Sequence, residues 1–166
     1  NLRMFKNICL VGLPYSGKSS LGRKLALAKN IGFIETDSMI QNKYNCQLKD
    51  LIKKNGVTDF LNKENNIAKT IHCENNIIST GGSMVYSKEA INHFRDNLNC
   101  KIIHLHLTLN EFRNRVGDLD ERGVINKYEL SINELYLERI QLCDSYSDIT
   151  INSDNKKDAL QRLLKE

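Results

Sequence analysis

The sequence contains no tryptophan, a single proline (Pro14), and five cysteines, no two of which form a CxxC pair. Without such pairs neither a zinc ribbon nor a CxxC redox motif is indicated, and we expect free thiols in a reducing compartment. No run of about 18 apolar residues occurs, so no membrane-spanning helix is expected. The first residues lack a signal-peptide pattern, and the expected location is the cytoplasm.

The sequence also carries little excess charge. Its formal net charge is +4, and its basic residues form no stripe interleaved with aromatic residues. Nucleic-acid binding is therefore not expected, whereas a mildly positive chain suits a small anionic ligand such as a nucleotide. A length of 166 residues, 40% of them hydrophobic, is typical of one domain that spans residues 1–166.

Short apolar runs alternate with amphipathic segments along the whole chain, which predicts an α/β domain with a parallel sheet. The predicted strands are 7–11, 32–35, 76–80, 101–107 and 149–151. The predicted helices are 18–29, 38–44, 48–55, 58–73, 88–97, 110–115, 132–143 and a last one from 156. The polar segment 116–130 has two glycines and no periodicity, so it is expected to be either disordered or a mobile lid.

The strongest motif is Gly12 to Ser19 (GLPYSGKS), which fits the phosphate-binding pattern GxxxxGK[ST]. It follows a buried-type strand and opens a helix, so backbone N–H groups converge on phosphate oxygens at a helix N-terminus. Lys18 is expected to reach the outer phosphates, and the Ser19 hydroxyl to coordinate Mg²⁺. The alternative is a glycine-rich turn with a solvated lysine. No guanine-specificity motif NKxD is present, which favours an ATP-dependent kinase over a GTPase.

Two acidic residues, Glu35 and Asp37, follow the second predicted strand. Ligands of open α/β sheets bind at the carboxyl ends of strands, so one carboxylate is expected to support the metal. The other would orient an acceptor hydroxyl and take its proton. The alternative for Asp37 is the N-cap of the helix that follows.

Two further features are candidates for an acceptor site. Thr80-Gly81-Gly82 ends the third predicted strand and exposes backbone N–H groups to a substrate, the alternative being a plain turn. Arg122 and Arg139, in and after the lid segment, are able to clamp a phosphate or a carboxylate, the alternative being two surface arginines. His104 and His106 share one face of their strand, but no third metal ligand accompanies them, and packing or surface roles are expected.

Together these motifs resemble the shikimate kinase family, small P-loop enzymes that transfer the ATP γ-phosphate to a shikimate hydroxyl. The resemblance extends from Asn7 to about Lys157 and includes the glycine segment Ile78–Gly82, the lid Glu121–Ile125 and Arg139–Asp148. It implies a P-loop NTPase-type α/β/α fold in three layers around a parallel sheet of about five strands. It also implies a monomer that uses ATP and Mg²⁺ and has a small hydroxylated substrate.

The resemblance implies a role for each matching residue. Lys18, Asp37 and Arg122 would be catalytic, with Asp37 as the base. Ser19 and Glu35 would support the metal, and Arg115 would stack on adenine. The full nucleotide set is Gly12, Ser16, Gly17, Lys18, Ser19, Ser20 and Arg115. The substrate set is Asp37, Gly81, Gly82 and Arg139, where Arg139 would grip a carboxylate.

Some positions depart from the family pattern. Leu61 stands where the family has a carboxylate-binding arginine, with Lys63 as a partial substitute, and Ser83 replaces a third glycine. Other departures are Glu35 for Asp, RGVI for Arg-Pro in the lid, and Gln141 and Cys143 for Pro and Tyr. These changes leave open a kinase of another small hydroxylated metabolite, or a catalytically weak nucleotide-binding relative. A gluconate or nucleoside monophosphate kinase is a further alternative.

Overall fold

The computed structural model describes residues 4–117, 124–126 and 129–166. Five parallel strands form one sheet in the order β2-β3-β1-β4-β5. The strands are β1 (Asn7–Val11), β2 (Gly32–Glu35), β3 (Asn76–Ser79), β4 (Cys100–His106) and β5 (Ile149–Asn152). The helices are α1 (Lys18–Lys29), α2 (Thr36–Tyr44), α3 (Leu48–Asn55), α4 (Val57–Lys69), α5 (Lys88–Asn92), α6 (Leu109–Val116), α7 (Ile132–Tyr146) and α8 (Lys156–Leu163).

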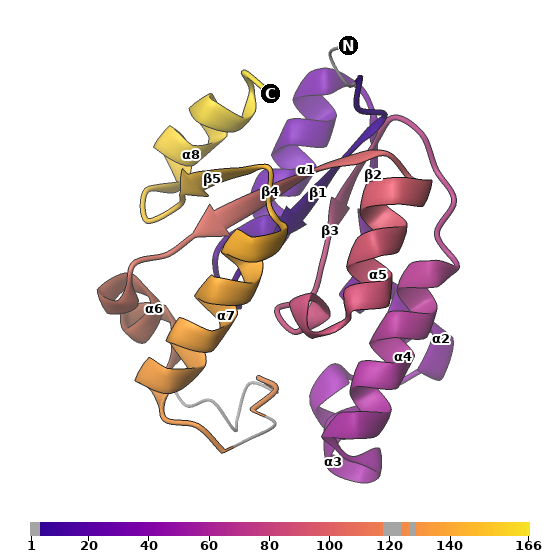
Figure 1. The fold of residues 1–166 in the computed structure, drawn as a ribbon, viewed down its shortest axis with the longest axis vertical. Coiled ribbons are helices and arrows are strands. Elements are labelled where there is room, and N and C mark those ends of the chain that lie inside the picture. Colours follow the sequence, from indigo (N-terminus) through magenta and orange to yellow (C-terminus); the bar gives the residue numbers. More distant parts are fainter. Residues whose placement is uncertain (1–3, 118–123, 127–128) are drawn as a thin grey trace.

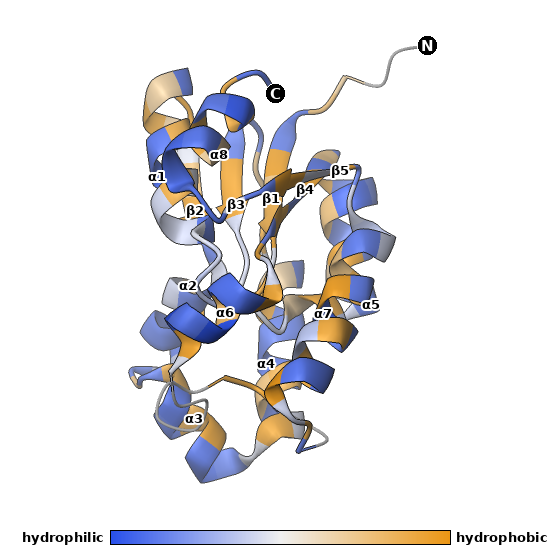
Figure 2. Ribbon diagram, turned by 90° about the vertical axis from the view of Figure 1, so that its left-hand side faces the viewer, coloured by the Kyte–Doolittle hydropathy of each residue, from blue (hydrophilic) through white to orange (hydrophobic). Residues whose placement is uncertain are grey.

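Helices cover both faces of the sheet, which gives three layers (Figures 1 and 2). On β1, Ile8 and Leu10 point to a core shared with α1 and α8, whereas Cys9 and Val11 point to a core shared with α4, α5 and α7. Every residue of β1 is buried, and Ile8 to Val11 form a continuous apolar run rather than an alternating one. The predicted fold class is therefore confirmed.

The predicted elements all occur, with small differences at their ends. The fourth helix ends at Lys69 rather than at Cys73, because Ile71 leaves the helix and packs into the core beneath the sheet. The helix predicted over 88–97 is α5 followed by one π-helical turn, His93–Asn97. Within the described part of the chain, none of the helices has the length and apolar character that a bilayer span requires.

The two helices that flank the predicted lid, α6 and α7, each begin at a capped residue. The Thr108 hydroxyl accepts from the Glu111 amide and caps α6, and Ser131 with Glu134 forms a capping box that begins α7. Residues 118–123 and 127–128 lie outside the described residues, and with them Arg122. The described residues between the two helices, 117, 124–126 and 129–131, form no helix or strand.

Candidate functional site

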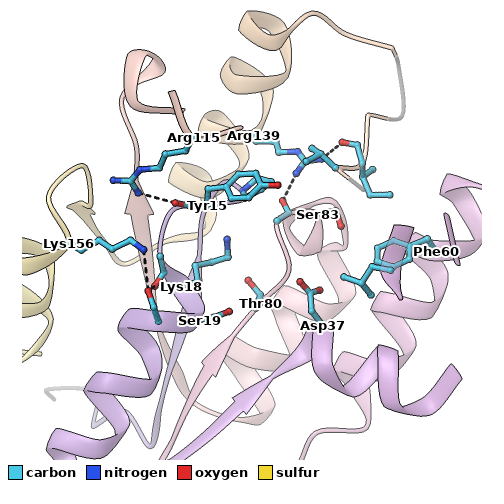
Figure 3. Close-up of a pocket in the computed structure, with 17 residues that line it drawn as sticks. Tyr15, Lys18, Ser19, Asp37, Phe60, Thr80, Ser83, Arg115, Arg139 and Lys156 are labelled. Carbon is cyan, nitrogen blue, oxygen red and sulfur yellow. Dashed lines mark hydrogen bonds between the residues drawn. The ribbon is translucent and has the colours of Figure 1, made fainter. Parts of the chain in front are cut away.

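A cavity of ≈ 570 Å³ opens at the carboxyl ends of β1 and β3, beside the start of α2 (Figure 3). Its volume is in the range of small-molecule sites. This edge of a parallel sheet is where the sequence predicts the site. The lining residues are Pro14, Tyr15, Gly17, Lys18, Ser19, Ser20, Asp37, Leu48, Phe60, Thr80, Gly82, Ser83, Arg115, Val124, Ile125, Arg139 and Lys156.

The loop between β1 and α1 forms a phosphate cradle. The Lys18 ammonium donates to the carbonyl oxygens of Gly12 and Leu13, at 2.9 and 2.7 Å, and lies 3.4 Å from the Ser16 hydroxyl. A Cβ at Gly12 would lie 2.6 Å from the Leu105 carbonyl oxygen, so only glycine lets the loop pass so close to β4. Burial lowers the pKa of Lys18 to about 8. The arrangement fits an anion, because a buried ammonium held only by neutral groups gains most from a negative ligand.

Ser19 and Glu35 face each other beside this cradle. The Ser19 hydroxyl donates to Glu35 Oε1, and Ser38 and Arg23 donate to Oε2, Arg23 at 3.0 Å. Burial raises the pKa of Glu35, but the hydrogen bonds from Ser19, Ser38 and Arg23 outweigh it and hold the pKa below its ordinary value. A hydroxyl next to an ionised carboxylate is a set of oxygen donors that suits Mg²⁺.

Asp37 lies in the first turn of α2, which begins at Thr36, so it does not serve as the N-cap of that helix. Its carboxylate lines the cavity, and burial raises its pKa, while Lys18 lowers it and Glu35 raises it. A Cβ at Gly81 would lie 2.4 Å from Asp37 Oδ1, so the glycine lets this carboxylate approach the end of β3. The Gly81 amide donates to the Thr36 hydroxyl at 3.1 Å, which ties α2 to that strand end.

A second carboxyl group lies behind Gly81, and the sequence interpretation missed it. Glu64 of α4 is fully buried, and the Ser83 hydroxyl donates to its two oxygens at 2.8 and 3.0 Å. Burial, with Asp37 nearby, raises the pKa of Glu64 to about 8, so the group is mainly neutral at pH 7. Ser83, which replaces a glycine of the family pattern, thus supplies the hydrogen bond that this buried acid needs.

Arg139 enters the cavity from α7 and is only 1% exposed. Its guanidinium donates to the Gly82 and Ile125 carbonyl oxygens, the former at 3.0 Å, and to the Tyr86 hydroxyl at 3.4 Å. It lies on the inward face of α7 with Leu135, Tyr136 and Cys143. A guanidinium has five N–H donors, and these contacts use three of them. Arg139 is therefore a buried cation with donors left for a ligand.

Arg115 and Lys156 line the end of the cavity opposite to Asp37 (Figure 3). Arg115 donates to the Tyr15 carbonyl oxygen at 2.9 Å and to the Asp154 carbonyl oxygen at 2.8 Å, and Lys156 lies 3.5 Å from the Ser20 hydroxyl. The cradle thus has two cations beside it. The stacking of Arg115 on adenine stays a prediction.

Leu61 and Lys63 do not line the cavity. Leu61 packs against the apolar cluster of α2, α3 and α4, and Lys63 forms an ion pair with Asp59 and lies over the Tyr44 ring at 5.1 Å. Because Lys63 pairs with Asp59 outside the cavity, it does not substitute for an arginine at position 61. Val124 and Ile125, from the described part of the lid segment, also line the cavity, and Ile125 belongs to one apolar cluster with Phe60 and Leu48.

The two strand histidines lie away from the cavity lining. His104 is fully buried and Nδ1 lies 2.8 Å from Asp144 Oδ1, while its ring meets that of His106 edge to face at 5.4 Å. Burial lowers the pKa of His104. Among residues 4–117, 124–126 and 129–166, no group of three or more His, Cys, Asp or Glu side chains gathers as a metal site.

Comparison with known proteins gives the family. The family model for shikimate kinase matches residues 14–166. The chain belongs to the shikimate kinase family. A shikimate kinase from Staphylococcus aureus strain JH9 is 33% identical over 134 residues, 80% of this chain and 76% of that protein. The predicted family and the predicted class, an ATP-dependent small-molecule kinase, are thereby confirmed.

Solved structures agree in fold. The shikimate kinase from Aquifex aeolicus has a TM-score of 0.83 at 25% identity, over 96% of this chain and 94% of that one. The shikimate kinase from Acinetobacter baumannii in complex with shikimate has a TM-score of 0.84 at 20% identity, over 98% of this chain and 93% of that one. The second likeness bears on the fold alone.

Proposed function

We propose that this enzyme transfers the γ-phosphate of ATP to a hydroxyl of shikimate, with residues 1–166 acting as one catalytic domain and as a monomer. The observation that supports it most is one continuous cavity that joins the Lys18 cradle to Asp37 and Arg139. A cradle at one end serves the nucleotide, and a carboxylate with a buried arginine at the other end serves a hydroxy acid.

Each end has a defined task in this proposal. Lys18 exchanges the carbonyl oxygens of Gly12 and Leu13 for phosphate oxygens and neutralises charge on the transferring group. Asp37 aligns the acceptor hydroxyl and takes its proton. Arg139 binds the acceptor carboxylate with the N–H groups that its backbone contacts leave. Arg122, outside the described residues, is proposed to close over the site.

Ser19 and Glu35 are the residues that would hold Mg²⁺, which when bound offsets the charge of the phosphates. Their hydrogen bond places two oxygens beside the cradle, and Glu35 stays ionised because its neighbours lower its pKa. Ser19→Ala and Glu35→Gln should both raise the Mg²⁺ concentration needed for half-maximal rate. An unchanged Mg²⁺ requirement in both variants contradicts this assignment.

The test of the acceptor is ADP release coupled to NADH oxidation, with shikimate compared against other hydroxy acids and polyols. Shikimate should stimulate ADP release above the rate without acceptor, and acceptors without a carboxylate should not. If another compound is strongly preferred, the enzyme is a kinase of that metabolite. If ATP binds and no acceptor stimulates the reaction, the chain is a nucleotide-binding relative.

A further inference from the structure

Tyr15 has an unusual backbone conformation in the phosphate loop. Its φ is 67°, in the left-handed region. Among the described residues, the others with positive φ that are not glycine are Asn30, Asn45, Asn75, Asn99 and Glu129. Asparagine tolerates this region, whereas a bulky aromatic residue rarely adopts it. A tyrosine in this conformation needs contacts that stabilise it. Strained residues of this kind cluster at functional sites.

Contacts from two directions hold Tyr15. Arg115 donates to its carbonyl oxygen at 2.9 Å, which anchors the backbone to α6. Its side chain packs against the apolar cluster of Leu13, Leu107, Phe112, Val116 and Tyr136, as Val124 also does. The ring is thus packed between the phosphate loop, the end of α6 and Val124.

The ring lines the middle of the cavity. In Figure 3 it lies between Arg115 and Lys156 on one side and Ser83 and Phe60 on the other, above Lys18 and Thr80. Its hydroxyl end is directed toward Ser83 and Arg139. Tyr15 therefore lines the cavity between its nucleotide end and its acceptor end and directs a polar atom toward the latter.

The acceptor end is short of donors for an anion. Leu61 offers none, and Lys63 is paired with Asp59. Glu64 is held by Ser83. Among the described residues, Arg139 is the cation that remains at this end. The phenolic hydroxyl of Tyr15, which is directed toward Arg139 in Figure 3, is able to donate to the same carboxylate, and hydrogen bonds to charged groups are the strong ones.

We propose that Tyr15 is a specificity-determining residue of the acceptor site: its ring is the wall against which the acceptor rests, and its hydroxyl donates to the acceptor carboxylate beside Arg139. The assignment rests on the proposed function. We therefore expect removal of the Tyr15 hydroxyl to weaken acceptor binding and to leave nucleotide binding unchanged.

The test is Tyr15→Phe, which keeps the ring and its backbone conformation and removes only the hydroxyl. The KM for shikimate should rise about tenfold or more, with the KM for ATP within about twofold. Tyr44→Phe is the matched control, because Tyr44 lies on α2 outside the cavity lining, and it should change neither constant. A carboxylate-free analogue of shikimate should lose nothing in Tyr15→Phe.

Tyr15→Gly is the second variant, because glycine adopts φ of 67° freely and removes the wall. It should keep ATP binding and raise the KM for shikimate further than Tyr15→Phe does. If wild type turns over shikimate and neither variant changes its KM, the Tyr15 assignment is wrong and the proposed function stands. If wild type does not turn over shikimate at all, the proposed function fails and the assignment fails with it.

Discussion

Glu64 makes a sharp prediction about stability and pH. Its carboxyl group is fully buried, and burial with Asp37 nearby raises its pKa from 4.5 to about 8. Between pH 4.5 and about 8 the folded protein therefore keeps a proton that the unfolded chain has already released near pH 4.5. Stability should fall as pH rises through this window, by up to about 1.4 kcal/mol per unit. Across the whole window the loss amounts to roughly 5 kcal/mol.

The substitution that isolates this effect is Glu64→Gln, which keeps the size of the side chain and does not titrate. Urea unfolding of both proteins from pH 5.5 to 7.5 should show wild type losing about 2–3 kcal/mol relative to the variant. His104 acts in the opposite direction, because its lowered pKa costs stability as pH falls, but it is present in both proteins and cancels.

A matched control is Glu74→Gln, since Glu74 is 63% exposed and pairs with Lys6 at the surface. The free energy of unfolding of Glu74→Gln should change with pH as that of the wild type does over the same range. Above pH 8 Lys18 acts in the opposite direction to Glu64, because its pKa is lowered from 10.5 to about 8 and the group adds stability as pH rises, but Lys18 is present in all three proteins. Parallel pH profiles for wild type and Glu64→Gln would refute the reasoning.

Three further substitutions test the acceptor end. Asp37→Asn should lower kcat about 10²–10⁴-fold, with ATP affinity by calorimetry unchanged, and equal turnover would remove Asp37 as base. Arg139→Lys loses the planar fork and should raise the KM for shikimate about tenfold or more, with a small effect on the KM for ATP. Leu61→Arg should leave the KM for shikimate unchanged, because Leu61 does not line the cavity, and a fall in this KM would show that position 61 faces the acceptor.

The sequence predicts most of the fold because local signals agree with the tertiary structure. The run Asn7–Val11 is buried along its whole length, and the glycine that follows it begins the phosphate loop. Helix ends also depend on tertiary packing, and the local sequence pattern carries no information about that packing. Ile71 fits the helical apolar pattern but leaves the helix, because its place in the core lies beyond the end of α4 at Lys69.

The parts of the site that the sequence did not predict arise from tertiary contacts. Glu64 lies in the polar string Asn62–Asn66, which is typical of a solvated helix face, yet it is buried against Ser83. In the sequence, Ser83 is only a departure from the glycine of the family pattern, because the pattern does not show that its hydrogen-bond partner is Glu64. Tyr15 occupies a position that the GxxxxGK[ST] pattern leaves open, so neither its backbone conformation nor its place in the cavity is visible in the motif.

We propose above that the enzyme transfers phosphate from ATP to shikimate in the cavity lined by Lys18, Asp37 and Arg139. Phosphorus NMR of a reaction with ATP, Mg²⁺ and shikimate tests it most directly, because it follows the product rather than ADP. We expect one phosphate-ester signal that grows in step with ADP and is lost in Asp37→Asn. Bound ATP without a shikimate ester, or an ester formed equally by Asp37→Asn, would contradict it.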